Sequence, residues 1–398
     1  MHIIKSGTDT VVPESLLLEK LKRGEELNIK LGVDPTAPDI HLGHAVPLRK
    51  LRQFQDLGHR VTLIIGDGTA LIGDPSGRNS TRPQLTREQI AANAQTYVDQ
   101  AFKILNPEKT TLCYNSEWIL DLDMEKLLKL LSNFTVARIL ERDDFHKRYT
   151  GGLPIALHEF LYPVMQAYDS VVIKADVEIG GSDQLFNLLA GRELMEKLGM
   201  EPQVALTLPL LEGTDGVQKM SKSYGNYVGL TDEPNDMFGK LMSITDQLVP
   251  MYFRLCSTVS VDEVDAIDAA YADGTADPYA LKRQLARNIV DLYHGEGAGQ
   301  AAQDAFDATF KRNQVPDDIP EFPASVATCG DDGKVYLGRL MVDLGLAKSA
   351  SEARRAVDGG AVKIDGTPVE AGCYNVDPAL LAPGTTIQSG KRRWARLA

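Results

Sequence analysis

The sequence predicts an α/β fold built on a doubly wound parallel sheet. Three observations support this prediction: short β-branched apolar runs recur through the first 230 residues, amphipathic stretches separate them, and turn residues bound each run. The candidate strands are residues 27–33, 61–65, 110–114, 170–173, 177–180 and 204–208. Buried parallel strands are typically short and apolar, and their alternation with helices indicates βαβ units.

Helices are predicted between these strands. The stretch after the first strand carries apolar residues at helical spacing, namely Val46, Leu48, Leu51, Phe54 and Leu57. Thr86 and Gln89 form a capping box before a second helix, and Gly199 ends another that spans residues 191–198. In a doubly wound sheet the ligand lies beyond the carboxyl ends of the strands, so we expect the functional site there.

The chain divides into three predicted parts. Residues 1–231 form a Rossmann-like domain, residues 232–332 a helical domain that ends in a linker, and residues 333–398 a small α+β domain. Strand signals fade in the second part, where Asp277-Pro278 is typical of a helix start. Prolines mark residues 315–324 as the linker.

The third part carries compact local signals of its own. Ser349 and Glu352 form a capping box, and the helix that they begin contains Arg354 and Arg355. Residues 361–364 then run into the hairpin turn signal Asp365-Gly366.

The composition is that of a globular protein with an uneven charge. The 398 residues include 42 Lys+Arg and 55 Asp+Glu, a net charge of −13, which at first sight disfavours a nucleic-acid partner. Residues 334–398, however, hold 10 Lys/Arg and 6 Asp/Glu, a charge of +4, and leave −17 for residues 1–333. This basic tail indicates a local anion contact, and chance fluctuation is the alternative.

The remaining composition favours a cytoplasmic protein. The four cysteines are scattered and predict neither a disulfide framework nor a zinc site, so free thiols in a reducing compartment are expected. No apolar run of about 18 residues predicts a membrane span. The N-terminal residues lack the layout of a secretion signal.

The first motif is a histidine pair in HLGH, residues 41–44. It follows the first predicted strand and begins a helix, so His41 and His44 lie on one face of the first turn. A helix start offers free N–H groups to a phosphate, and Gly43 permits a close approach to the backbone. The alternatives are a solvated helix start and a metal site; the second lacks a third ligand at matching spacing.

The second motif is KMSKS, residues 219–223, which follows the last predicted strand of the sheet. Lys219 and Lys222 in a glycine-flanked loop can reach phosphates and neutralise charge that develops during a reaction. A solvated basic loop is the alternative for such a pair alone. The combination of both motifs at one edge of the sheet favours a phosphate site.

HLGH and KMSKS, in this order, resemble the two signatures of class I aminoacyl-tRNA synthetases. Residues 66–77, 162–169 and 180–184 resemble bacterial tyrosyl-tRNA synthetases, in particular the variant with a KMSKS-type lysine loop. Residues 335–396 resemble the small RNA-binding domain that this family carries at its C-terminus. The resemblance covers nearly the whole chain and is weakest over residues 232–313.

This resemblance implies a cytoplasmic, homodimeric enzyme that acts on tyrosine, ATP with Mg²⁺, and tRNA(Tyr). It would form tyrosyl-adenylate and then transfer tyrosine to the 3′-terminal adenosine of the tRNA. No membrane partner and no protein-bound metal are implied. Because the amino-acid carboxylate is already ionised at pH 7, the first step needs orientation and charge stabilisation rather than a protein nucleophile.

The family's functional residues carry over by matching position. His41, His44, Lys219 and Lys222 would act in catalysis, and ATP would also contact Asp34, Thr36, Gly43, Gly181 and Asp183. Tyrosine would be bound by Asp74, Tyr162, Gln166, Asp169 and Gln184, with Asp169 reading the phenolic hydroxyl. The tRNA contacts would include Arg354, Arg355 and Lys363, and Arg78 and Arg82 are candidates for pyrophosphate.

Two positions depart from the better-known bacterial pattern. Lys30 stands where a tyrosine contacts the phenolic hydroxyl; it either donates to that hydroxyl or points to solvent. Pro47 stands where threonine is frequent and removes a possible nucleotide contact.

Three rival functions fit the sequence less well. A tryptophan–tRNA ligase would not generally carry the basic tail, and a nucleotidyltransferase has no need of the lysine loop. A catalytically silent RNA-binding protein has no need of both intact motifs.

Overall fold

The computed structural model describes residues 1–35, 40–74, 86–310, 319–330, 332–390 and 393–398. It comprises two compact units, Met1–Gly299 and Gln300–Ala398. Within the described ranges, no helix combines the length and apolar character needed to cross a membrane.

The first unit is organised by a six-stranded sheet. Its order is β1 (Thr10–Val12), β6 (Val204–Leu208), β5 (Val177–Gly181), β2 (Asn28–Val33), β3 (Arg60–Ile65) and β4 (Thr110–Tyr114). The last five strands are parallel, and β1 runs antiparallel to β6 at the edge. The predicted doubly wound sheet is therefore confirmed.

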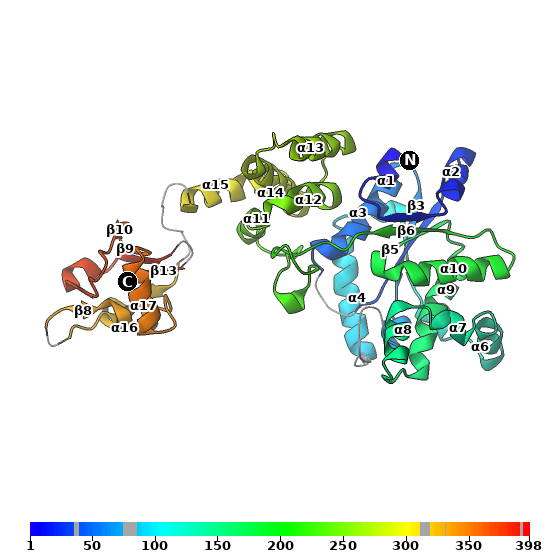
Figure 1. Cartoon of the computed structure of the whole chain (residues 1–398), viewed down its shortest axis with the longest axis horizontal. Coiled ribbons are helices and arrows are strands. Elements are labelled where there is room, and N and C mark those ends of the chain that lie inside the picture. Colours follow the sequence, from blue (N-terminus) through cyan, green and yellow to red (C-terminus); the bar gives the residue numbers. More distant parts are fainter. Residues whose placement is uncertain (36–39, 75–85, 311–318, 331, 391–392) are drawn as a thin grey trace. The chain divides into compact units, whose positions relative to one another are not determined.

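The connections place helices on both faces of this sheet. Helix α3 (Leu42–Asp56) leads from β2 to β3, and α10 (Leu185–Lys197) leads from β5 to β6 on the other side of the β2–β5 pair. Because both crossovers are right-handed but proceed in opposite directions, the two helices cover opposite faces (Figure 1). The order of the strands reverses between β2 and β5, which is where such sheets bind ligands.

One predicted strand is wrong. Residues 170–173 form the last turn of α9 (Leu161–Ile173), a helix that packs against α10. Its short apolar ending resembles a buried strand, and a run of that length cannot distinguish the two structures. The spacing of Tyr162, Gln166 and Asp169 on one helical face is confirmed.

Further helices complete this unit. Before β4, they are α1 (His2–Lys5), α2 (Glu14–Arg23) and α4 (Arg87–Ala101), with 3₁₀ turns at Thr69–Leu71 and Pro107–Lys109. Between β4 and β5 lie α5 (Ser116–Ile119), α6 (Met124–Leu131), α7 (Val136–Ile139), α8 (Asp143–Thr150) and the 3₁₀ turn Leu157–Phe160. The Thr86 capping box is present, since Gln89 N donates to Thr86 Oγ1 and Gln89 Oε1 accepts from Thr86 N.

Helices dominate after the sheet, as the sequence predicts. They are α11 (Pro234–Met242), α12 (Val249–Cys256), α13 (Val261–Asp273), α14 (Pro278–His294) and α15 (Ala298–Phe310). Short 3₁₀ turns span Lys222–Tyr224 and Asp246–Leu248 in this region, and another, Ser182–Gln184, lies earlier, between β5 and α10. Asp277 caps α14 by accepting from the backbone N–H groups of Tyr279 and Ala280.

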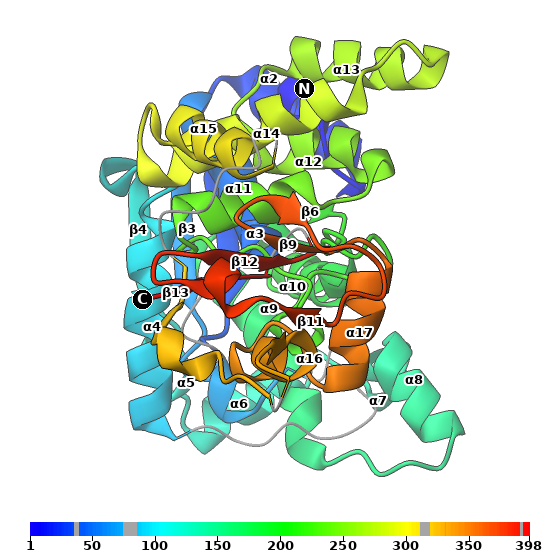
Figure 2. The ribbon, with the colours of Figure 1, turned by 90° about the vertical axis from the view of Figure 1, so that its left-hand side faces the viewer.

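The second unit is an α+β domain, with α16 and α17 beside its strands in Figure 2. Its sheet has the order β10 (Thr367–Pro368), β9 (Val362–Ile364), β12 (Thr386–Ser389), β13 (Arg393–Leu397) and β7 (Glu321–Phe322). A smaller pair joins β11 (Asn375–Val376) to β8 (Val335–Tyr336). Helices α16 (Leu337–Asp343) and α17 (Ala350–Asp358) and the 3₁₀ turns Ala324–Val326 and Pro378–Leu381 complete it.

Local signals in this unit are largely confirmed. Asp365 and Gly366 have φ values of 46° and 78° and join β9 to β10 as the predicted hairpin. The predicted linker is partly wrong, because its residues 321–322 form β7 and pair in parallel with β13. Residues 315–318 of that linker lie outside the described ranges.

Candidate active site

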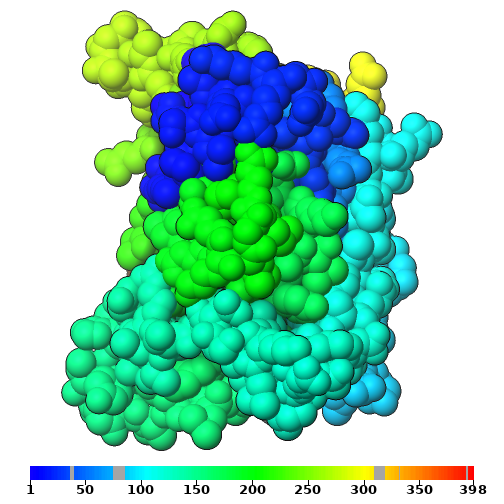
Figure 3. All heavy atoms as spheres, turned by 90° about the vertical axis from the view of Figure 1, so that its right-hand side faces the viewer, coloured from blue at the N-terminus to red at the C-terminus, as the bar shows by residue number. Residues whose placement is uncertain are grey.

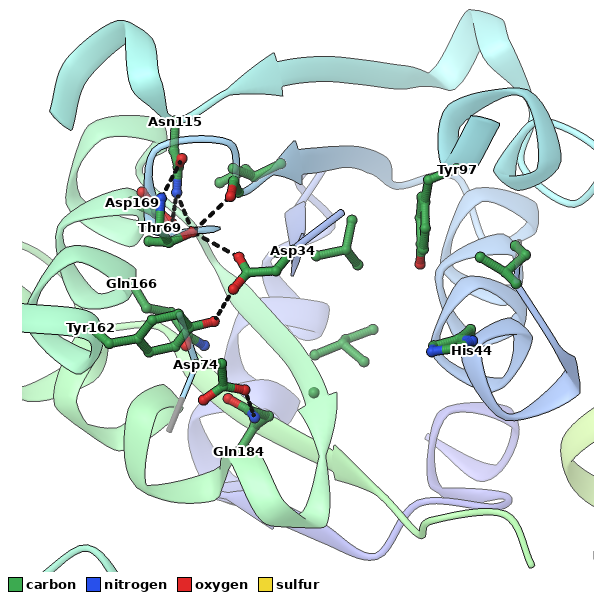
Figure 4. A pocket seen from close by; sticks show the side chains of 17 residues that line it. Asp34, His44, Thr69, Asp74, Tyr97, Asn115, Tyr162, Gln166, Asp169 and Gln184 are labelled. Carbon is green, nitrogen blue, oxygen red and sulfur yellow. Dashed lines mark hydrogen bonds between the residues drawn. The ribbon is translucent and has the colours of Figure 1, made fainter. Parts of the chain in front are cut away.

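A pocket of about 240 Å³ opens at the carboxyl ends of β2, β3 and β5. Seven of the predicted site residues line it, namely Asp34, His44, Asp74, Tyr162, Gln166, Asp169 and Gln184. Figure 4 shows that they come from both sides of the β2–β5 switch point, with His44 on one side and the α9 residues on the other. The topology thus assembles residues far apart in the sequence.

The histidine motif and the lysine loop meet at the same edge of the sheet, as predicted. Leu42 N donates to Val228 O over 3.0 Å, and Leu230 N donates to Ile40 O over 3.1 Å. These two bonds pair the segment after the lysine loop with the start of α3. The start of α3 and the segment that follows the lysine loop therefore lie side by side as an antiparallel pair.

The two histidines stack on the first turn of α3. Their ring centroids are 3.9 Å apart, and His44 Nδ1 accepts from His41 N over 3.3 Å. Burial, followed by the charges of His44 and Lys222, lowers the pKa of His41 to about 3. The His44 ring is open to the pocket, but the surrounding protein desolvates it and, with Lys222, lowers its pKa to about 4. Both rings are therefore neutral at pH 7.

Gly43 lies against the His41 ring, at a position where a side chain would be crowded. A Cβ atom there would lie 3.0 Å from atoms of the His41 ring. The group that comes close to the Gly43 backbone in the structure is therefore the His41 ring.

The lysine loop is held in shape by Asn226, which is 3% exposed. Its Oδ1 accepts from Ser221 N over 2.8 Å, and its Nδ2 donates to Asp215 Oδ2 over 3.1 Å and to Lys219 O over 3.2 Å. A Cβ atom at Gly213 would lie 2.2 Å from the Asn226 amide, so glycine is required there. The loop backbone is therefore defined by a polar anchor that the lysine pattern alone does not reveal.

Lys219, Lys222, Gly181 and Asp183 lie beside the pocket rather than in its lining. The Lys222 charge acts on both histidines, and the Lys219 charge acts on the Asp183 carboxylate. Partial desolvation raises the pKa of Asp183, and Lys219 opposes that shift. Gly181 and Asp183 directly follow Gly180, which lines the pocket.

Asp169 is a buried carboxylate at the end of the pocket formed by α9. Trp118 Nε1 donates to its Oδ1 over 2.8 Å, and Asn115 Nδ2 donates to its Oδ2 over 3.3 Å. Burial raises the pKa of Asp169 to about 6, against the stabilising effects of Lys30 and of these two donors. The carboxylate is ionised at pH 7 and is held ready to accept a further hydrogen bond.

Asp34 links β2 to the α9 residues. The Tyr162 hydroxyl donates to Asp34 Oδ2 over 3.0 Å, and the Thr69 hydroxyl donates to Asp34 Oδ1 over 2.8 Å. Burial, with the charges of Asp34 and Asp74, raises the pKa of Tyr162 well above its ordinary value. Tyr162 therefore stays protonated and orients its oxygen toward incoming donors.

A second chain of hydrogen bonds joins the other polar residues. Gln184 Nε2 donates to Asp74 Oδ2 over 3.2 Å, and Asn187 Nδ2 donates to the side-chain oxygens of Gln184 and Gln166 over 2.8 and 2.9 Å. Arg142 donates to Asp74 and to Asn187, over 3.2 and 3.1 Å. Asp74, Gln166 and Gln184 are therefore preorganised as a group.

Lys30 follows neither predicted alternative. It is 0% exposed and pairs with Glu178 over 2.8 Å. Its ammonium group also donates to Gln166 O over 2.9 Å and to Ser170 Oγ over 2.7 Å. It thus holds α9 to the sheet from behind the pocket, and it does not line the pocket.

The comparison with known proteins agrees with this geometry. Residues 22–311 match the family described as tRNA synthetases class I (W and Y), and residues 337–379 match the S4 domain. A tyrosine–tRNA ligase of Geobacter sulfurreducens is 50% identical over 100% of this chain and 98% of the ligase. One of Burkholderia thailandensis is 52% identical over 100% and 94%. This chain belongs to the tyrosyl-tRNA synthetase family.

Solved tyrosyl-tRNA synthetases share its fold. A C-terminally truncated mitochondrial enzyme of Aspergillus nidulans has a TM-score of 0.64 at 24% identity and covers 78% of this chain and 93% of its own. The enzyme of Archaeoglobus fulgidus, complexed with L-tyrosine, has a TM-score of 0.62 at 22% identity and covers 76% and 98%.

Several contributors to this synthetase pocket were not predicted. They are Thr69, Asn115, Trp118, Arg142 and Asn187. Asn115 and Trp118 follow β4, so the rule that ligands bind beyond strand ends points to them. Thr36, Arg78 and Arg82 were predicted but lie outside the described ranges.

The predicted tRNA contacts of this synthetase lie in the second unit. Arg354 and Arg355 are exposed on α17, and Lys363 is half-buried in β9. The Arg354 guanidinium lies 5.6 Å from the ring centre of Tyr336 and 5.7 Å from that of Tyr374. This arginine is therefore held at the surface by two aromatic rings.

Proposed function

We propose that this chain is a tyrosine–tRNA ligase. It activates tyrosine with ATP to form tyrosyl-adenylate, and then transfers tyrosine to the 3′-terminal adenosine of tRNA(Tyr) for translation. The observation that carries the proposal is Asp169: an ionised carboxylate, 3% exposed, in the lining of a pocket of about 240 Å³. A phenolic hydroxyl can satisfy such an acceptor, whereas phenylalanine would leave it without its hydrogen bond.

The residues at the α9 end of the pocket can bind the ammonium group of the substrate. Asp74 and Gln166 present oxygen atoms within one hydrogen-bonded group, and Gln184 supports Asp74. Tyr162 adds its hydroxyl oxygen from the neighbouring pair with Asp34. A carboxylate and neutral oxygens together suit an ammonium ion. We assign these four residues, with Asp169, to tyrosine binding.

The histidine motif and the lysine loop would act on ATP in the first chemical step. The tyrosine carboxylate attacks the α-phosphorus of MgATP, the bond to the bridging oxygen of pyrophosphate breaks, and pyrophosphate leaves. Neutral His41 and His44 at a helix start donate hydrogen bonds, and Lys219 and Lys222 supply positive charge. Asp34, Thr36, Gly43, Gly181 and Asp183 complete the nucleotide contacts that we assign, and Mg²⁺ enters with ATP.

The second unit supplies the RNA contacts in this proposal. Arg354, Arg355 and Lys363 bind tRNA phosphates, in keeping with the S4 domain match and the local charge of the tail. We also propose three domains, residues 1–231, 232–332 and 333–398, and a cytoplasmic location.

We propose a homodimer on the basis of exposed apolar side chains. Met124, Leu128, Val136 and Leu157 are 70%, 60%, 64% and 82% exposed. They belong to the region between β4 and β5, which occupies the lower part of Figure 3. Apolar exposure of this kind marks interaction surfaces, and a second copy of the chain is the occupant we propose.

Charging of tRNA tests the proposal. The purified chain should attach labelled tyrosine to tRNA(Tyr) in the presence of MgATP, and it should leave tRNA(Trp) uncharged with tryptophan. A tryptophan–tRNA ligase is not favoured, because relatives about 50% identical over the full chain are tyrosine–tRNA ligases. Binding of tRNA without charging would instead identify a catalytically silent RNA-binding protein.

A further inference from the structure

Arg142 is a buried cation beside the residues that we assign to the ammonium group of the substrate. It is 4% exposed, its Nη2 lies 3.2 Å from Asp74 Oδ1, and its Nε lies 2.8 Å from Asp144 Oδ1. A cation beside an ammonium site is unfavourable by charge alone, because like charges repel and the repulsion grows where water is excluded. Arg142 is not among the described residues that line the pocket, so its effect on a ligand passes through its neighbours.

The hydrogen bonds that start at Arg142 all run in one direction. A guanidinium group has five N–H donors and no acceptor, so Arg142 Nη1 can only donate to Asn187 Oδ1, over 3.1 Å. The Asn187 amide is therefore turned with its oxygen toward Arg142 and its Nδ2 toward the two glutamines. Nδ2 donates to Gln184 Oε1 over 2.8 Å and to Gln166 Oε1 over 2.9 Å, which uses both of its N–H groups.

The same direction continues to the far ends of this network. Gln184 Nε2 donates to Asp74 Oδ2 over 3.2 Å (Figure 4), and Gln166 Nε2 donates to Glu178 Oε1 over 3.2 Å. The oxygen and nitrogen of an amide are similar in size, so only the hydrogen-bond partners decide which atom lies where. Here a group that can only donate stands at one end, and carboxylates that accept stand at the others. Arg142 thus determines where the oxygens of Gln166 and Gln184, which line the pocket, are placed.

We propose that Arg142 is a positioning residue for recognition of the substrate's ammonium group: by fixing the direction of this network, it keeps the side-chain oxygens of Gln166 and Gln184 in place as acceptors. Each of these oxygens takes one hydrogen bond from Asn187 and has a second lone pair. This inference rests on the proposed function and gives a role to a residue outside both sequence motifs. It also accounts for the cation beside an ammonium site, because the gain in acceptor orientation outweighs the repulsion.

Two phenols that differ only in the ammonium group separate this role from packing. Tyramine carries the ammonium group, 4-ethylphenol lacks it, and neither has a carboxylate that ATP could activate. Their dissociation constants are measured by equilibrium dialysis for the unmodified chain, for Arg142→Gln, and for Asn187→Leu, which interrupts the network one residue further on. Arg148→Gln is the matched control, because Arg148 is 1% exposed and pairs with Glu159 over 2.6 Å. Tyrosine-dependent pyrophosphate exchange by the unmodified chain is measured in parallel.

Arg142→Gln and Asn187→Leu should each weaken tyramine binding by about ten- to a hundredfold, the worth of one hydrogen bond to a charged group, and leave 4-ethylphenol binding unchanged. Arg148→Gln should change neither, and Asn187→Leu decides the question if Arg142→Gln does not fold. Unchanged or tighter tyramine binding in Arg142→Gln would overturn the inference, because the cation would then contribute nothing or only repulsion. Equal losses with both phenols, or the same tyramine loss in Arg148→Gln, would overturn it in favour of general packing. Absence of exchange in the unmodified chain would instead refute the proposed function.

Discussion

The buried ion pair of Lys30 and Glu178 should contribute strongly to the stability of the first unit. The perturbation is Lys30→Met, which keeps much of the side-chain length and removes the ammonium group. Lys30 and Glu178 are 0% and 1% exposed and lie 2.8 Å apart. Removing the lysine therefore leaves the Glu178 carboxylate buried between β5 and α9 without its positive partner.

The size of the stability loss depends on the hydrogen-bond donors that remain around Glu178. Breaking a buried ion pair from one side costs about 3–5 kcal/mol. Glu178 keeps donors from the side chains of Gln166, Ser170 and Gln203, which offset part of that cost. We therefore expect the free energy of unfolding to fall by about 3 kcal/mol, a large part of the 5–15 kcal/mol typical of a domain.

Urea denaturation followed by tryptophan fluorescence measures this change. A Trp394→Phe background leaves Trp118 as the sole tryptophan, so that the signal reports the first unit alone. The double variant Lys30→Met with Glu178→Gln should recover most of the lost stability, because it leaves no buried, unpaired charge. Lys129→Met, which breaks the exposed pair with Glu125, is the matched control and should change stability little. A Lys30→Met variant as stable as its background would show that the buried ion pair does not stabilise the first unit.

Three further predictions concern the proposed activity. Tyrosine affinity should fall about tenfold for each pH unit below 6, because protonation of Asp169 removes the acceptor, and in Asp169→Asn this pH dependence should vanish. Lys222→Ala should lower the kcat of pyrophosphate exchange at least tenfold with little change in the KM for tyrosine, and an equal effect of the exposed Lys22→Ala would contradict a specific role. Arg354→Ala should raise the KM for tRNA several-fold in charging assays without altering exchange, whereas Arg339→Ala, on an exposed residue of α16, should alter neither.

The sequence predicts the parts of the site that depend on local order along the chain. A strand followed by HLGH and a later strand followed by KMSKS must share the carboxyl edge of a parallel sheet, and the structure joins them through Leu42 and Leu230. Spacings of four and three also predict that Tyr162, Gln166 and Asp169 share a helical face. These features follow from helical and sheet periodicity, which the sequence carries directly.

The remainder depends on which elements become neighbours. The pairing of Lys30 with Glu178 requires β2 to lie beside β5, a choice that no local pattern reveals. Arg142 reaches Asp74 across 68 residues for the same reason. The strand predicted at residues 170–173 is wrong for a different reason, because a short run with three apolar residues suits a helix end as well as a strand.

Tyrosine-dependent pyrophosphate exchange tests the assignment of this pocket to tyrosine activation, since it requires the whole pocket and no tRNA. With MgATP, labelled pyrophosphate and the intact chain, we predict exchange with tyrosine and none above background with phenylalanine or tryptophan at the same concentration. Asp169→Ala should abolish the preference for tyrosine over phenylalanine. Exchange supported equally by phenylalanine in the intact chain, or no exchange with tyrosine, would contradict the account.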